Sequence, residues 1–443
     1  MIKNILIAAA TVISVAAQAQ TPHRWTLREC MAHALENNIE IKRMDIETQK
    51  RETELSTARN SRLPDLNASA GQNFSFGRGL TAQNTYSDNN TSNTSFTLAT
   101  SVPLFTGFNI PNTIELNRLN LKAALADLEK ARNDIRMQVA AAYVQALYAM
   151  ELLDVAQRQT AIDSMQSSRL REMYSNGKVS GVDVAQQDAT LAASRLTATQ
   201  ANNDVRLSLL TLSQLLELPS PEGFSIARPD SAGMSRAQSA PLPLPDEIFS
   251  EAMLIKPEIQ AGQLRVKGME KSILIARSAL YPKLSLTAGI GTNYYTASGF
   301  DTDGFGSQMR NNFSQNIGLN LSIPLFNRFS TRNSIRTARL NRQEQQLVLD
   351  NTKKALYKEI QQAYYNAVAA ETGYRSSSEA LTSSEAAFRL MSAKYEYGKA
   401  NITEFNEAKN NYMKAESDLS RARYEYMYQK ALLGFYKGDE LDF

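Results

Sequence analysis

Few residues in this chain have side chains suited to catalysis or metal binding at neutral pH. The sequence contains two histidines, His23 and His33, and one cysteine, Cys30, all near its start. Structural zinc sites use about four such ligands in spaced pairs, and here no second pair exists. With no second cysteine, Cys30 cannot form an internal disulfide, and we interpret it as a small core residue. We therefore expect no metal site and no cofactor.

The other signatures of an enzyme are also missing from the sequence. We find no glycine-rich loop that would bind phosphate and no convergent set of nucleophile, base and oxyanion donors. The net charge of +3 argues against a nucleic-acid surface. We predict that the chain is not an enzyme, has no catalytic residues and binds no nucleic acid, so that any energy source belongs to a partner.

The first residues predict export from the cytoplasm. Lys3 precedes an apolar run from Ile5 to Ala17, and Ala17-Gln18-Ala19 has the small-x-small pattern of a cleavage site. We interpret 1–19 as a signal peptide, with the mature chain starting near Gln20. Beyond it we find no apolar stretch close to the ~20 residues that a membrane helix needs. If the protein enters a membrane, we expect it to do so as strands.

The mature chain contains two copies of one unit. Such an internal repeat is identified first, because the other elements are then assigned within each copy. Pro64 corresponds to Pro282 at an offset of 218 residues, whereas Pro103 corresponds to Pro324 at an offset of 221. Tyr174-Ser175-Asn176-Gly177-Lys178 returns at the same offset of 221 as Tyr395-Glu396-Tyr397-Gly398-Lys399. We expect a first repeat at 20–218, a proline-rich irregular connector at 219–245 and a second repeat at 246–443.

Each repeat has the same order of elements: a helix, two strands and two long helices. In the first repeat we expect helices at about 26–60, 111–176 and 183–217 and strands at about 64–76 and 94–105. In the second we expect helices at about 246–278, 332–397 and 402–436 and strands at about 282–295 and 313–326.

The strand segments alternate between apolar and short polar residues. Around Pro324, one face carries Ile317, Leu319, Leu321, Ile323 and Leu325, and the other carries Asn316, Gly318, Asn320 and Ser322. A soluble sandwich would show the same alternation. The signal peptide and the absence of a helical span favour a membrane barrel, with the polar loops at about 77–93 and 298–312 facing outward. Four strands cannot close such a barrel, so an oligomer is required, whether a dimer or a larger ring.

The long helices exceed anything needed in a compact domain. Ile110 to Asn176 has Pro111 at a helix start and no glycine, and Arg332 to Tyr397 is interrupted only by Gly373. Each is roughly 65 residues, or about 100 Å at 1.5 Å per residue. Residues stepping by four and three form the expected buried seam of a coiled coil: Ile135, Val139, Ala142, Ala146, Ala149 and Leu153, and at offset 221 Leu356, Ile360, Ala363, Ala367, Ala370 and Tyr374. Gly177 and Gly398 suit left-handed caps at the hairpin tips.

These motifs resemble the TolC family of outer-membrane factors. The resemblance rests on Pro-Leu-Phe before a long helix, at Pro103 and Pro324, and on the tip sequences Tyr174-x-x-Gly177 and Tyr395-x-x-Gly398, with an acid six residues past each glycine. It covers about 26 to 436. It implies a homotrimer with a twelve-stranded transmembrane β-barrel, continued by a mainly α-helical barrel across the periplasm. It also implies a periplasmic adaptor (membrane fusion) protein and an inner-membrane pump of the RND, ABC or MFS class.

The resemblance further implies a gate at the helix tips. The family's acidic rings match Glu404 and Glu407, while in the first repeat Asp183 is an acid and Gln186 stands where Glu407 does. Tyr395 matches a tyrosine that restrains the gate, and Ala400 replaces the gate arginine of some members. Acidic rings at a constriction favour cations. The alternative is that these acids only stabilise helix N-termini.

The sequence thus predicts a passive export duct in the outer membrane that extends into the periplasm, in contact with outer-membrane lipid. A periplasmic coiled-coil adaptor or scaffold without a pore is the alternative, and it would not need the four alternating strands. The cargo, whether drug, metal ion or protein, stays open.

Overall fold

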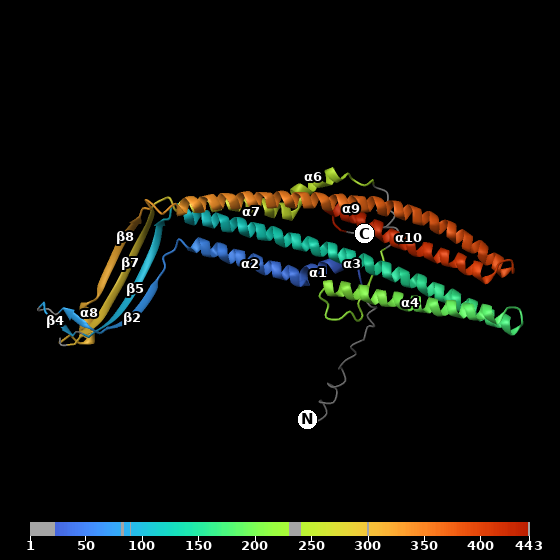
Figure 1. Cartoon of the computed structure of the whole chain (residues 1–443), viewed down its shortest axis with the longest axis horizontal. Helices are drawn as coiled ribbons and strands as arrows, with labels where there is room; N and C mark the ends of the chain where they lie inside the picture. Colours follow the sequence, from blue (N-terminus) through green and yellow to red (C-terminus); the bar gives the residue numbers. More distant parts are fainter. Residues whose placement is uncertain (1–22, 81–83, 89, 230–240, 299–300, 442–443) are drawn as a thin grey trace, which may run out of the picture. The chain divides into compact units, whose positions relative to one another are not determined.

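The computed structural model describes residues 23–80, 84–88, 90–229, 241–298 and 301–441 (Figure 1). The signal peptide expected at 1–19 lies outside these residues. The chain forms two compact units: unit 1 comprises 1–43, 130–255 and 355–443, and unit 2 comprises 44–129 and 256–354. Each unit takes segments from both halves of the sequence, so a repeat is not a spatial domain.

Unit 2 contains a four-stranded antiparallel sheet. Its strands are β2 (Asn67–Ser75), β5 (Thr91–Phe105), β7 (Lys283–Ala297) and β8 (Ser314–Ser322), in the spatial order β2-β5-β7-β8. The central pair β5–β7 joins the two repeats, because β5 comes from the first half and β7 from the second. β2 and β8 are the edges of this sheet within one chain.

One face of the sheet leaves large apolar side chains exposed. Leu66 is 70% exposed, Phe74 is 60%, Ile317 is 77% and Leu319 is 68%. Single exposed apolar residues are ordinary, but a contiguous set across a sheet indicates a surface that something else covers. The alternation expected from the sequence is therefore confirmed in the strands, with the apolar set on one face.

The connections at the far end of the strands contain short elements that the alternation did not predict. β3 (Arg78–Leu80) and β4 (Tyr86–Asp88) form a small hairpin, and α8 (Phe305–Asn311) is a short helix before β8. Gln308 of α8 accepts a hydrogen bond from the backbone N–H of Tyr295 (2.9 Å) and donates to its carbonyl (2.9 Å). These contacts fasten α8 to the end of β7.

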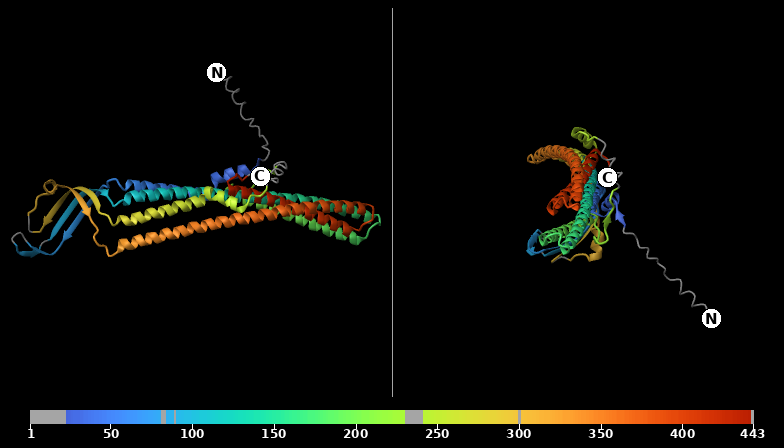
Figure 2. Two further views of the ribbon diagram at one scale, coloured as in Figure 1. Left: turned by 90° about the horizontal axis from the view of Figure 1, so that it is seen from above. Right: turned by 90° about the vertical axis from the view of Figure 1, so that its right-hand side faces the viewer.

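Four helical segments of unit 2 follow the order of the strands. They belong to α2 (Ile39–Asn60), α3 (Asn109–Ser175), α7 (Pro257–Ser278) and α9 (Ser330–Glu396), and Figure 1 and the left panel of Figure 2 show them side by side in that order. Leu55 and Ala58 of α2 pack on Ile114 of α3. Arg265 of α7 is paired with Asp127 of α3, and Arg342 of α9 lies 3.2 Å from Glu270 of α7.

The chain passes from strand to helix through two consecutive left-handed residues in both repeats. Gly107 and Phe108 have φ values of 62° and 67°, and their counterparts Arg328 and Phe329 have 53° and 61°. Only glycine adopts this region without strain. A Cβ on Gly107 would lie 2.5 Å from the carbonyl oxygen of Ser278. The junction marked by Pro103 and Pro324 is thus a defined backbone turn.

Unit 1 is built on two helical hairpins. The first joins the later part of α3 to α4 (Gly181–Leu215), and the second joins the later part of α9 to α10 (Ile402–Lys437). The predicted seam is confirmed, since Val139, Ala146, Ile360 and Ala367 are all completely buried. Cys30 is also buried, as expected of a core residue, and burial raises its pKa to about 12.

Two expected helices are each broken in two. The predicted helix at 26–60 is α1 (Leu27–Asn37) followed by α2, and the break is at Asn38, whose side chain donates to the carbonyl of Leu215 (3.2 Å). The predicted helix at 246–278 is α6 (Pro245–Ile255) followed by α7, because Pro257 cannot continue a helix from Lys256. Pro257 was a visible signal for this break.

The described parts of the connector, 219–229 and 241–245, contain regular elements that its prolines did not indicate. β6 (Ser225–Ile226) pairs in parallel with β1 (Arg24–Trp25), and α6 begins at Pro245. The hydroxyl of Tyr143 donates to the carbonyl of Ala227 (2.6 Å). This pairing ties the start of the described chain to the connector and to α3.

The expectation of no helical membrane span is corrected in one place. By length and composition α3 contains an 18-residue window with a mean hydropathy of 1.3, which would suffice to cross a membrane. Half of that window is buried within the protein, as in the core helix of a helical unit. We therefore assign the apolar residues of this window to the buried seam between helices.

Candidate gate at the helix tips

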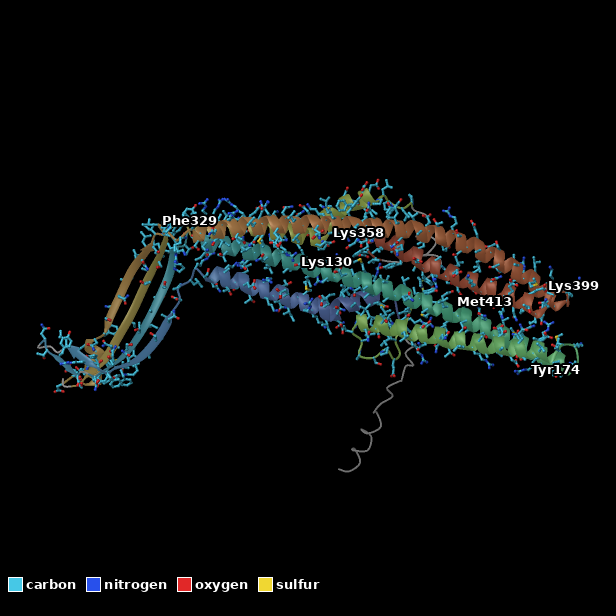
Figure 3. All side chains as sticks on the ribbon, in the orientation of Figure 1. Lys130, Tyr174, Phe329, Lys358, Lys399 and Met413 are labelled. Carbon is cyan, nitrogen blue, oxygen red and sulfur yellow. The ribbon has the colours of Figure 1, made fainter. Side chains whose placement is uncertain are left out.

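Both hairpins of unit 1 end in the same type of turn. Figure 3 labels Tyr174 and Lys399 at these two ends. Gly177 and Gly398 have φ values of 72° and 66°, the left-handed conformation expected from the sequence. Past each glycine, the backbone N–H of the next residue donates five residues back, from Lys178 to Met173 (2.9 Å) and from Lys399 to Lys394 (2.8 Å).

The first acid of each tip caps the helix that begins there. Asp183 Oδ2 accepts from the backbone N–H of Ser180 (3.1 Å), and Glu404 Oε2 accepts from the backbone N–H of Asn401 (2.9 Å). In return the Ser180 hydroxyl and the Asn401 side chain accept from the N–H groups of these acids. Each pair is a capping box, so both carboxylates have a local structural role.

The second acid is free of such a role. Glu407 lies one turn along α10 from Glu404 and is exposed, and it makes no hydrogen bond or ion pair in the part of the chain that the structure describes. Its counterpart Gln186 on α4 is exposed and uncharged. Of the sequence-predicted acids, Glu407 is therefore the one whose carboxylate is available for another partner.

Tyr395 connects the two hairpins. Its hydroxyl accepts a hydrogen bond from Gln166 Nε2 on α3 (2.5 Å), and its ring stacks on Phe405 of α10 at 4.9 Å between centroids. The Arg169 guanidinium lies 5.8 Å from the ring centroid. Burial is the main reason why the pKa of Tyr395 is raised. A tyrosine expected to restrain the gate thus bonds a helix of the first repeat to helices of the second.

Behind the tips lies a buried ion pair that sequence reasoning missed. Lys409 of α10 donates to Asp163 Oδ1 of α3, and their side chains are 0% and 1% exposed. Lys409 also donates to Asn406 (3.3 Å), and Asn406 donates to Gln187 of α4 (3.3 Å). The seam spacing could have revealed Lys409, because it falls in phase with the buried residues Ile402, Phe405 and Met413.

A second carboxylate supports the first hairpin. Asp188 of α4 accepts from the Ser167 hydroxyl (2.6 Å) and from Arg171 (3.0 Å), both on α3. These hydrogen bonds lower the pKa of Asp188. Arg158 of α3 is paired with Glu416 of α10, so α3 also has a charged contact with the second hairpin. These polar contacts add to an apolar cluster at the tips, in which Leu170 of α3 packs with Ile402 and Phe405 of α10.

This arrangement can position and restrain helices, but it does not assemble reactive groups. Within the described ranges no group of three or more His, Cys, Asp or Glu side chains could hold a metal ion. Pro103 and Pro324 lie at the strand-to-helix junctions of unit 2, so they belong to a different part of the protein from the tip residues.

Comparison with known proteins identifies the class. The solved CusC structure aligns with a TM-score of 0.78 at 17% identity, covering 94% of this chain and 92% of that one. The MtrE outer-membrane channel of Neisseria gonorrhoeae aligns with a TM-score of 0.73 at 20% identity, covering 93% of this chain and 88% of that one. At these identities the likeness shows the fold, which is that of outer-membrane channels.

The sequence comparisons then give the family. TolC of Escherichia coli is 23% identical over 403 residues, covering 88% of this chain and 78% of that protein. CyaE of Bordetella pertussis is 26% identical over 302 residues, covering 67% of this chain but only 61% of that protein. The model of the family described as outer membrane efflux protein matches twice, at residues 31–217 and 248–436. The chain belongs to the outer membrane efflux protein family, and the resemblance to TolC is confirmed. It is an outer-membrane channel protein.

Proposed function

We propose that three copies of this chain form a passive export duct through the outer membrane. The four strands of each copy contribute to one twelve-stranded barrel, and the helices continue it as a tunnel into the periplasm. The observation that supports this most directly is the sheet of unit 2. It is open at β2 and β8, and both edge strands have nine residues.

Pairing between copies would satisfy the backbone hydrogen-bonding groups that stay unpaired at the edge strands of one copy. The strands alternate in direction from β2 to β8, so β8 of one copy and β2 of the next are antiparallel neighbours. An unpaired edge in lipid would cost several kcal/mol for each backbone group. The exposed apolar face that includes Leu66, Phe74 and Ile317 is then the surface that contacts lipid.

The gate of this duct is the ring of tip residues. In a trimer Glu407 would occur three times at the constriction, and Glu404 and Asp183 would add carboxylates that are also bonded to their own helix caps. Such rings attract cations. Tyr395 would restrain the closed state through Gln166, on an element of the other repeat.

The partners of the duct would be a periplasmic adaptor protein and an inner-membrane pump of the RND, ABC or MFS class. Membership of the outer membrane efflux protein family supports this, because members serve as the outer-membrane part of export systems. One related protein, OpmQ of Pseudomonas aeruginosa, is named for the export of pyoverdine. The cargo of this chain would depend on the pump with which it assembles.

The duct is tested by reconstituting the purified full chain into planar lipid bilayers. We expect a trimer by mass and discrete single-channel currents. A trimer-forming protein that fails to insert and conducts no current would contradict the duct and favour a periplasmic scaffold instead.

The gate is tested by neutralising its acids. We expect Glu407→Gln to weaken the block of single-channel current by divalent cations, and Glu404→Gln to do so less, because the Glu404 carboxylate already accepts a hydrogen bond from the Asn401 N–H. Glu379→Gln, on the exposed surface of α9, is the matched control. Unchanged block in the Glu404→Gln/Glu407→Gln double variant would overturn the acidic gate.

A further inference from the structure

A groove in unit 2 is lined by three arginines and by apolar side chains. The volume of the groove is about 760 Å³. It lies at the beginning of α9, where Figure 3 labels Phe329. The lining residues are Leu280, Phe329, Arg332, Asn333, Ile335, Arg336 and Arg339. All three arginines are exposed, and none has an ion-pair partner in the described part of the chain. No acidic residue is among those that line the groove.

The arginines form a single stripe on α9. At 100° per residue, Arg332, Arg336 and Arg339 point within about 40° of a common direction. The side of α9 that faces α7 is marked by Leu349, which lies against Gly262, and by Arg342, which is paired with Glu270. The stripe lies about a quarter turn from that side. The face of α9 opposite the arginine stripe carries short or uncharged polar residues: Ser334, Thr337, Asn341 and Gln345.

The chirality of the chain decides whether the stripe faces the duct. Because the N–H of Asp65 donates to the carbonyl of Ser101 (3.2 Å), the odd-numbered, polar residues of β2 direct their backbone groups toward β5. The sheet is viewed here from inside the duct, so that its polar side chains point toward the observer and β2 runs upward. The L-configuration of the residues then places β5 to the right of β2. The helices follow in the same order, so α9 runs downward with α7 on its left. On a right-handed helix the arginines then point away from the observer, to the outer surface.

The groove lies directly beyond the end of a strand that contacts lipid in the proposed duct. β8 ends at Ser322, and the next residues present Leu325, Phe326 and Phe329, which are 93%, 73% and 59% exposed. Aromatic side chains that follow a membrane strand mark the boundary between the apolar core and the headgroups. The arginine stripe begins three residues after Phe329, at the level where lipid phosphates lie.

We propose that this groove binds the phosphate of an anionic phospholipid in the periplasmic leaflet of the outer membrane. Arginine presents a fork of N–H donors that matches phosphate oxygens. Leu280, Phe329 and Ile335 supply the apolar surface for the glycerol and the first acyl carbons. The inference rests on the proposed duct, because it uses the outward direction of α9 and the lipid-facing strands.

A neighbouring copy is a poorer fit to the stripe. The side of α9 turned away from α7 presents Leu340 and Leu347, which are 55% and 69% exposed, and this apolar side suits contact with another copy. On α2, Glu47 and Glu54 are paired with Arg51 of the same helix, whereas Glu52 is exposed and has no ion pair among the described residues. The exposed leucines, and not a surplus of acids, are therefore what favours a neighbouring copy on this side of α9.

The experiment compares headgroups on the purified full-length protein. Native mass spectrometry would count bound lipid during titration with phosphatidylglycerol, with phosphatidylcholine and with inorganic phosphate. We expect preferential retention of phosphatidylglycerol. We expect Arg332→Gln/Arg336→Gln/Arg339→Gln to lose this preference by about tenfold, since each basic residue near an anionic surface adds to the attraction. The triple lysine variant should keep most of it, and added salt should weaken it.

The matched control is Arg195→Gln/Arg206→Gln/Arg389→Gln, which removes three exposed arginines from unit 1. Equal retention of phosphatidylcholine, an undiminished preference in the first triple variant, or equally strong binding of inorganic phosphate would each overturn the lipid site. Single-channel recordings on the same preparations separate this result from the duct. A conducting protein without headgroup preference refutes the lipid site alone, whereas a protein that does not conduct refutes the duct.

Discussion

Lys409 and Asp163 form an ion pair in which the two side chains are 0% and 1% exposed. Lys409 comes from α10 of the second repeat and Asp163 from α3 of the first, 246 residues apart in the sequence. Charged side chains are almost never buried this completely unless they are paired. This contact therefore holds the two hairpins of unit 1 in register just behind the tip residues.

Removing one partner should cost more than removing both. Lys409→Met leaves Asp163 as a buried unpaired charge, whose Oδ2 already has no hydrogen-bond partner among the described residues. We expect a loss of about 3–5 kcal/mol of stability, because breaking a buried pair leaves an uncompensated charge. We expect Lys409→Met/Asp163→Leu to recover most of this loss. Thermal unfolding of the full chain, followed by circular dichroism, provides the measurement.

The exposed Lys414→Met on the same helix is the control for this pair. We expect it to change the midpoint little, as surface substitutions usually do. A double variant no more stable than Lys409→Met would show that the pair is not what couples these helices.

The sequence predicted the long helices and strands because their signals are repeated and local. The seam through Val139 and Ile360 recurs at one offset, and the structure buries both residues. The breaks at Asn38 and Lys256 were missed because helical periodicity continues on both sides of each break. Pro257 was a local signal for one of them, whereas Asn38 bonds to Leu215, and a contact so distant in sequence leaves no local pattern.

The tip residues were predicted less completely. Glycine caps and capping acids follow from short motifs, so Gly177, Gly398, Asp183 and Glu404 could be found. The bond from Gln166 to Tyr395 joins residues 229 apart, and no periodicity specifies it. The role of Glu404 also needed coordinates, since the same glutamate suits a capping box or a gate until its hydrogen bonds are seen.

Removing the Tyr395 hydroxyl tests whether it restrains the tips. Tyr395→Phe keeps the ring stacked on Phe405 and loses the bond from Gln166. One hydrogen bond contributes about 1 kcal/mol, so we expect little change in the thermal midpoint. We expect a larger or more frequently open single-channel current in planar bilayers, because the two hairpins would separate more easily.

Tyr412→Phe is the matched control for this substitution. Its ring stacks on Phe388 at 5.5 Å between centroids, and its hydroxyl makes no hydrogen bond in the described part of the chain. We expect its current to equal that of the unmodified protein. Equal currents for Tyr395→Phe and Tyr412→Phe would remove Tyr395 from the gate.

The first hairpin should respond to acid through Asp188. Hydrogen bonds from Ser167 and Arg171 lower its pKa in the folded protein below the ordinary value of 3.8. A lowered folded pKa means that its contribution is complete above the unfolded value and is lost as pH falls through the folded value. We expect Asp188→Asn to lower the thermal midpoint at neutral pH, with the difference shrinking as the pH falls below the ordinary pKa value of 3.8. The exposed Asp204→Asn should show no such convergence, and a constant deficit for Asp188→Asn would exclude the charge as the cause.

The junction turns should tolerate substitution unequally in the two repeats. Gly107 has a φ of 62°, and a Cβ there would lie 2.5 Å from the Ser278 carbonyl oxygen and 2.8 Å from the Tyr281 Cβ. We expect Gly107→Ala to destabilise the folded protein by more than ~1 kcal/mol, since it adds a clash to a left-handed backbone. At the equivalent position Arg328 already adopts a φ of 53°. There Arg328→Gly relieves strain while loosening the unfolded chain, so we expect a change within about 1 kcal/mol. Resistance of the purified protein to heat and urea would measure both, and equal losses at the two sites would contradict this asymmetry.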